Sequence, residues 1–173
     1  MNFVYVIGPP GVGKSTLVRG LIGNASTCDA LTWKIPEMHH TTPRGTVVEF
    51  GRERDPFRGT DTLAMNAITY AEQIVENEVH PLMLCEGDRL ACDRFFDAVS
   101  RHYSLTLVHV DAEPEELQAR RAGRGTNQDE KWIKGRTTKA ERLADKWGAT
   151  RITADLDSLL RIDSPVIRTL GAP

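Results

Sequence analysis

Short apolar runs alternate with amphipathic stretches along the chain, and this order predicts strands that alternate with helices. The apolar runs are rich in β-branched and aromatic residues, which is typical of buried strands, and they cover residues 2–7, 46–50, 82–85, 105–110 and 150–153. Helices are predicted over about 14–22, 61–78 and 128–147, with a further helix that begins near Pro114. We therefore expect one three-layer α/β domain over residues 1–173, with a parallel sheet of about five strands covered on both faces.

The turn between the first predicted strand and the first predicted helix carries a phosphate-binding pattern. It matches GxxxxGK[ST] at every fixed position, and the flanking strand and helix are the context that this motif requires. Glycines let successive backbone N–H groups converge on phosphate oxygens, and the helix N-terminus adds the positive end of its dipole. We expect Lys14 to reach the β- and γ-phosphates of a nucleotide, Ser15 to ligate Mg²⁺, and Thr16 to cap the helix or contact the α-phosphate. The motif alone does not separate kinases from ATPases, GTPases or motor modules. The predicted cofactor-binding residues in this turn are Gly8, Pro9, Pro10, Gly11, Val12, Gly13, Lys14, Ser15 and Thr16.

Two carboxylates follow the predicted strand 82–85. Ligands of open α/β sheets bind at the carboxyl ends of the strands, and phosphoryl transfer needs little more there than positioning and charge. We expect Glu86 to lie on the metal side of a catalytic site, and Asp88 to orient or deprotonate the acceptor. The reverse assignment stays open, as does an ordinary polar loop.

An arginine-rich stretch, residues 51–61, precedes the second predicted helix. A phosphate or another anion would bind to Arg52, Arg54 and Arg58, helped by the N-terminus of the helix that follows. Asp61 is then a candidate for hydrogen bonding to the acceptor. An ordinary charged loop is the alternative. Arg89 and Arg136 are further candidates for substrate binding.

A basic segment covers residues 120–142, with eight basic and three acidic residues. Arg120, Arg121 and Arg124 surround a glycine-containing loop, which predicts a lid over about 120–138 that closes on the triphosphate. Arg121 and Arg124 are candidate catalytic residues that neutralise charge on the transferred group, and Arg120 is a candidate for cofactor binding. The same segment offers a surface for a DNA backbone, whereas a solvated helix face is the simpler interpretation of Lys131 and Lys134.

Composition narrows the function classes. The 22 basic and 24 acidic residues give a net charge of −2, which excludes a globally basic nucleic-acid coat. No run of 18 apolar residues predicts a membrane span, and the start of the chain lacks the basic region of a signal peptide. Three cysteines without a CxxC pair argue against a disulfide framework and favour a cytoplasmic protein. We interpret His39 and His40 as loop residues and the tryptophans Trp33, Trp132 and Trp147 as packing residues.

The phosphate-binding turn, the acidic strand end at 86–88 and the arginines of the lid resemble the P-loop kinases of the nucleoside-monophosphate-kinase-like group. That group includes adenylate, guanylate and thymidylate kinases, shikimate and gluconate kinases, and phage kinases that phosphorylate 5-hydroxymethyluracil in DNA. The resemblance implies a parallel sheet, commonly in the order 2-3-1-4-5, with Lys14 on phosphate and Ser15 on Mg²⁺. Residues 50–61 match no substrate signature of the group.

We therefore expect a phosphotransferase that uses ATP and Mg²⁺ and acts on a nucleotide or a nucleobase-type acceptor, since the arginine-rich side suits an anion. A 5-hydroxymethyl pyrimidine in DNA is one version of that acceptor. Two alternatives are kept: a small-metabolite kinase of the shikimate or gluconate type, and a regulatory ATP-binding module with slow hydrolysis.

Overall fold

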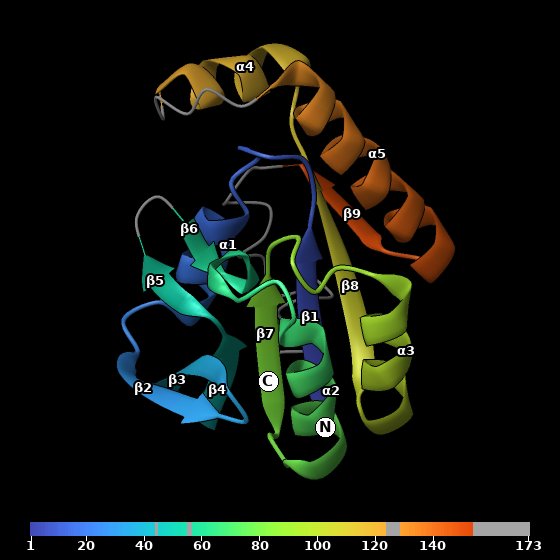
Figure 1. Cartoon of the computed structure of the whole chain (residues 1–173). Helices are drawn as coiled ribbons and strands as arrows, with labels where there is room; N and C mark the ends of the chain where they lie inside the picture. The colour runs from blue at the N-terminus through green and yellow to red at the C-terminus, as the bar shows by residue number, and fades with distance from the viewer. Residues whose placement is uncertain (44, 55–56, 124–128, 154–173) are drawn as a thin grey trace.

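The computed structural model describes residues 1–43, 45–54, 57–123 and 129–153 of the chain. Seven strands form the main sheet: β1 (Asn2–Ile7), β2 (Ser26–Thr32), β3 (Ile35–Thr42), β4 (Gly45–Phe50), β7 (Leu82–Glu86), β8 (Ser104–Asp111) and β9 (Thr150–Thr153). Their order across the sheet is β2-β3-β4-β7-β1-β8-β9, so the strand that leads into the phosphate-binding turn lies inside the sheet (Figure 1).

The five strands expected from the sequence are confirmed, and so is their order. Numbered along the chain as 1 to 5, they are β1, β4, β7, β8 and β9, and they lie side by side in the order 2-3-1-4-5 with parallel pairing. The sheet is mostly parallel, and it has two further strands that were not expected: β2 pairs antiparallel with β3, and β3 pairs antiparallel with β4. His39 and His40 therefore lie on strand β3 and not in a loop.

The β2–β3 hairpin was missed because its turn has unusual residues. Trp33 and Lys34 form a two-residue turn in which both φ angles are positive, 47° and 68°. Such turns are normally built from Asn and Gly, which tolerate positive φ. A second missed feature is a separate two-stranded sheet of β5 (Arg52–Arg54) and β6 (Phe57–Gly59), within the arginine-rich stretch 51–61.

Five α-helices complete the described fold: α1 (Lys14–Ile22), α2 (Ala67–Asn77), α3 (Asp93–His102), α4 (Pro114–Gly123) and α5 (Glu130–Trp147). α1 has the predicted bounds, and α4 and α5 begin within two residues of the expected positions. The helix expected from Asp61 starts only at Ala67, because a single 3-10 turn, η1 (Thr60–Thr62), comes first. The sequence analysis did not predict α3, whose buried Phe95, Phe96 and Val99 nevertheless have helical spacing.

The helices cover both faces of the sheet, as expected for three layers. On one face, Phe3 and Tyr5 of β1 pack with buried residues of α2, α3 and α5. On the other, Val4 and Val6 pack with residues of α1 and α4. Figure 1 shows α5 along β8 and β9 at one side of the sheet. Within the described residues, no helix is both long and apolar enough to cross a membrane.

Candidate active site

The phosphate-binding turn joins β1 to α1, and it packs directly against the neighbouring strand. At Gly8, φ is +148° and a Cβ atom would lie 2.4 Å from the carbonyl oxygen of Val110 on β8, so only glycine fits there. Lys14 begins α1, and its Nζ donates hydrogen bonds to the carbonyl oxygens of Gly8 and Pro9, both at 3.1 Å. The ammonium group is thus held over the turn, where the phosphates of a nucleotide would bind.

Ser15 and Glu86 link the turn to the end of β7. The Ser15 hydroxyl donates a hydrogen bond to Glu86 Oε1 at 2.7 Å. Only 2% of Glu86 is exposed, and this burial raises the pKa of its carboxyl to about 7, although Lys14 and the Ser15 hydroxyl oppose the shift. Hydroxyl and carboxylate oxygens are the ligands that Mg²⁺ prefers, so this pair fits the metal site expected from the sequence.

The η1 turn brings another carboxylate, that of Asp61, to the end of β7. Thr60 donates a hydrogen bond to the backbone oxygen of Glu86 at 3.0 Å, and Asp61 Oδ1 accepts one from the backbone N–H of Asp88 at 2.8 Å. The turn lies so close to β7 that a Cβ atom at Gly87 would be 2.6 Å from the Thr60 hydroxyl oxygen. Asp61 is therefore fixed beside the acidic end of β7.

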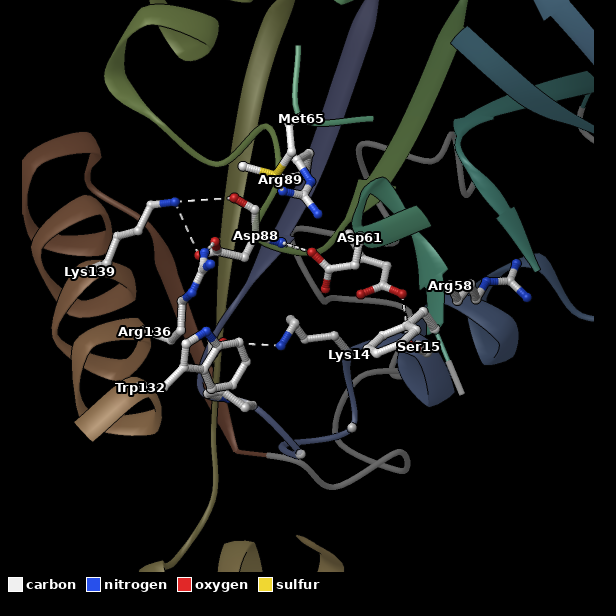
Figure 2. A pocket seen from close by; sticks show the side chains of 16 residues that line it. Lys14, Ser15, Arg58, Asp61, Met65, Asp88, Arg89, Trp132, Arg136 and Lys139 are labelled. Atoms are coloured by element: carbon white, nitrogen blue, oxygen red, sulfur yellow. Dashed lines mark hydrogen bonds and ion pairs between the residues drawn. The ribbon is translucent and has the colours of Figure 1, made fainter. Parts of the chain in front are cut away.

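These groups surround one cavity of about 630 Å³ (Figure 2). One side consists of the phosphate-binding turn, with Gly8, Pro10, Gly11, Gly13, Lys14 and Ser15. The other residues come from β6, η1 and its C-terminal flank, the end of β7, and α5: Phe57, Arg58, Asp61, Met65, Glu86, Asp88, Arg89, Trp132, Arg136 and Lys139. Donor and acceptor residues predicted from distant parts of the chain thus share a single space. The remaining turn residues are absent from this lining: Pro9 and Val12 are buried, and Thr16 is exposed.

Asp88 is held by two cations of α5. It forms ion pairs with Arg136 and with Lys139, whose Nζ lies 3.1 Å from Asp88 Oδ1 and also 3.1 Å from its backbone oxygen. Burial, together with the neighbouring Arg136, lowers the pKa of Lys139. Both carboxylate oxygens of Asp88 thus face cations of α5, and these ion pairs hold α5 against the cavity. The predicted role of Asp88 toward the acceptor stays a prediction.

Arg89 lines the cavity from the segment after β7. Its Nη1 contacts the sulfur of Met65, and among the described residues its buried Nε has no hydrogen-bond partner. The substrate-binding role of Arg89 stays a prediction.

The three arginines of the 51–61 stretch do not gather around one anion. Across the β5–β6 pair, Glu53 lies opposite Arg58, whereas Arg52 and Arg54 project from the other face of β5. Arg58 is buried and donates to both carboxylate oxygens of Glu49, at 3.2 and 2.8 Å, and to Glu53 at 2.9 Å. Its charge is therefore already neutralised. Arg52 and Arg54 are exposed and do not line the cavity, and Arg52 borders a separate cavity of about 360 Å³.

The lid arginines are described only in part. Arg120 on α4 donates a hydrogen bond to the backbone oxygen of Val12 at 2.8 Å and forms an ion pair with Glu116. It supports the phosphate-binding turn from outside and does not line the cavity. The side chain of Arg121 and the whole of Arg124 lie outside the described residues.

Four cavity residues were missed as site residues: Phe57, Met65, Trp132 and Lys139. Trp132 was interpreted as a packing residue, yet 42% of it is exposed and its side chain faces the cavity from α5. Trp33, also expected to pack, is half exposed at the β2–β3 turn, whereas Trp147 does pack against Phe96. The spacing of Trp132, Arg136 and Lys139 places them on one helix face, which is the signal that would have grouped them.

Comparison with known proteins identifies the family of the chain. The family model P-loop Nucleotide Kinase3 matches residues 1–162. The comparison with curated proteins found no significant match. Among solved structures, the chain is similar to an unliganded sugar kinase from Janibacter sp. HTCC2649, with 15% identity, 98% of each chain covered and a TM-score of 0.48. Because the family model covers nearly the whole chain and the phosphate-binding turn lies where the motif requires, the protein belongs to the P-loop Nucleotide Kinase3 family and is a kinase-type phosphotransferase.

Proposed function

We propose that the protein transfers the γ-phosphoryl group of ATP, with Mg²⁺, to a nucleotide or a nucleobase-type acceptor. The observation that carries the proposal is the shared cavity. The phosphate-binding turn forms one wall, and the rest of the lining includes the carboxylate of Asp61 and the cations Arg89, Arg136 and Lys139. A phosphoryl donor and an anionic or polar acceptor can therefore meet within one cavity.

On the donor side, Lys14 and the backbone N–H groups of the turn hold the β- and γ-phosphates. Ser15 and Glu86 would hold Mg²⁺, which supplies charge neutralisation on the phosphates when it is bound. Burial raises the pKa of Glu86 to about 7, and a cation bound beside it would favour the ionised carboxylate. Nucleotide binding would also separate the Lys14 ammonium from the carbonyl oxygens that it now contacts.

On the acceptor side, the three acids of the cavity differ in their partners. Glu86 accepts the Ser15 hydroxyl, and Asp88 is paired with two cations of α5. Asp61 takes part in no ion pair with the described side chains, and one of its oxygens is fixed by the backbone N–H of Asp88. We assign to Asp61 the positioning of an acceptor hydroxyl, and to Arg89 and Arg136 the binding of acceptor phosphate or the stabilisation of transferred charge.

In one version of the proposal, the acceptor base is part of DNA. Most described cations of the 120–142 segment are engaged within the protein, since Arg120 pairs with Glu116, Arg136 and Lys139 pair with Asp88, and Arg142 pairs with Asp93. Lys131 and Lys134 stay exposed on α5. A contact to a DNA backbone through these residues would make transfer to DNA fall steeply with salt, whereas transfer to a free nucleotide would change little.

The test is transfer of label from γ-labelled ATP with Mg²⁺, assayed against separate acceptor classes. These are nucleoside monophosphates, DNA with and without 5-hydroxymethyl pyrimidines, and small hydroxy acids such as gluconate and shikimate. We expect label on a nucleotide or nucleobase acceptor, lost in Lys14→Ala. Label on small hydroxy acids alone would overturn the proposed acceptor class. Label released only as free phosphate would replace the kinase reaction with slow hydrolysis by a regulatory module.

A further inference from the structure

Two aromatic side chains are exposed around the cavity, and core packing does not explain them. Phe57 is 50% exposed and Trp132 is 42% exposed, and both line the cavity. Met65, which lines it as well, is 82% exposed. The other described phenylalanines, by contrast, are fully buried in the core. Exposed apolar groups that gather around a polar cavity mark a ligand site.

The indole of Trp132 is held in place by its neighbours. The guanidinium carbon of Arg136 lies 5.2 Å from the centre of the Trp132 ring, and Arg136 is in turn paired with Asp88 (Figure 2). This chain of contacts runs from the end of β7 to the aromatic ring on α5. An aromatic side chain oriented in this way loses little conformational entropy when a ligand stacks on it.

Phe57 reaches the cavity from a different element. It lies on β6, directly before the buried Arg58 that fixes this strand through Glu49. The cavity is thus lined by one aromatic residue from β6 and one from α5. Its volume of about 630 Å³ lies within the range of pockets that hold a small ligand.

We propose that the acceptor presents a flat nucleobase ring that stacks on Trp132, in the cavity that Phe57 also lines. This inference rests on the proposed function and specifies how the acceptor is recognised. Arg89 lines the same cavity, and its guanidinium carries N–H donors for a polar atom on the edge of the base. Stacking binds any planar base, and the edge contact adds selectivity.

The test compares Trp132→Leu and Trp132→Phe with the matched control Trp33→Leu, since Trp33 is also half exposed but lies at the β2–β3 turn. Stacking of a base on an aromatic side chain is worth about 1–3 kcal/mol, which corresponds to roughly a 5- to 150-fold change in affinity. We expect Trp132→Leu to raise the KM for the acceptor by about tenfold or more. The KM for ATP should stay within about twofold of wild type, and Trp132→Phe should recover most of the loss.

Fluorescence gives a second readout that does not depend on turnover. A nucleoside titrated without ATP should quench the emission of wild type and of Trp33→Leu, and the quenching should disappear in Trp132→Phe. An unchanged acceptor KM in Trp132→Leu, or a rise in the KM for ATP instead, would overturn the inference while the transfer reaction itself stands. Quenching by methyl glycosides but not by nucleosides would also overturn it. Absence of transfer by the wild-type protein to any acceptor would refute the proposed function instead.

Discussion

The raised pKa of Glu86 makes a prediction about stability that does not require the substrate. Burial raises the pKa of this carboxyl from 4.5 to about 7. Between these two pH values the folded protein therefore binds more protons at this position than the unfolded chain does. The free energy of unfolding then falls as pH rises from about 4.5 to about 7, and above pH 7 the ionisation of Glu86 changes it no further.

The magnitude follows from the size of the shift. A shift of about 2.5 pH units corresponds to about 3 kcal/mol, which is the cost of ionising the buried carboxyl in the folded protein. Glu86→Gln keeps the shape and an oxygen that can accept the Ser15 hydrogen bond, but it cannot ionise. The variant should therefore resemble wild type in stability near pH 5 and exceed it by up to about 3 kcal/mol near pH 8.

The assay is urea unfolding of both proteins at several pH values between 5 and 8.5, without Mg²⁺ or nucleotide. The result that would refute the reasoning is a difference in free energy of unfolding that does not change with pH. Addition of Mg²⁺ and ATP supplies a further check. Both should stabilise the wild type at pH 8 more than the variant, because a bound cation favours the ionised carboxylate.

Three further predictions concern other parts of the account. The pKa of Asp93 is lowered to about 2, above all by a hydrogen bond from Trp147. Asp93→Asn should therefore lower the free energy of unfolding at pH 7 by about 1 kcal/mol. Measured by denaturant unfolding, this difference between variant and wild type should vanish as pH falls from about 4 towards 2. Gly87→Ala should lower the melting temperature by several degrees more than Gly23→Ala. Both glycines have positive φ, but only at Gly87 would a Cβ atom clash with neighbouring atoms. An equal fall in melting temperature would contradict this prediction. Ser15→Ala should weaken ATP binding, measured by calorimetry, about tenfold with Mg²⁺ and little without it. Equal weakening with and without Mg²⁺ would contradict the assignment of this hydroxyl as a metal ligand.

The sequence predicts the donor side of the site well, for local reasons. The phosphate-binding turn is a continuous motif between a strand and a helix, so its residues are neighbours in the sequence as well as in space. The acidic end of β7 is found by the same logic, because an apolar strand ends there. The antiparallel hairpin of β2 and β3 has no such local signal, since its turn consists of Trp33 and Lys34.

The acceptor side depends on contacts that one sequence does not reveal. Arg52, Arg54 and Arg58 look equivalent in the sequence, but strand alternation and the buried Glu49 separate Arg58 from the other two. Trp132 resembles a packing residue until α5 is placed beside the cavity. In both cases the partner lies in a distant segment, so the role of the side chain follows from tertiary packing and not from local pattern.

The central claim is that the shared cavity is the place of phosphoryl transfer, and the rate of transfer tests it most directly. That rate should be measured with the best acceptor for wild type, Lys14→Ala and the control Lys34→Ala, whose lysine lies over Tyr70 at the β2–β3 turn. The account predicts a loss of at least about a hundredfold in Lys14→Ala, because one charge-stabilising donor is typically worth that much, and no change in the control. Transfer by Lys14→Ala at the wild-type rate would contradict the account.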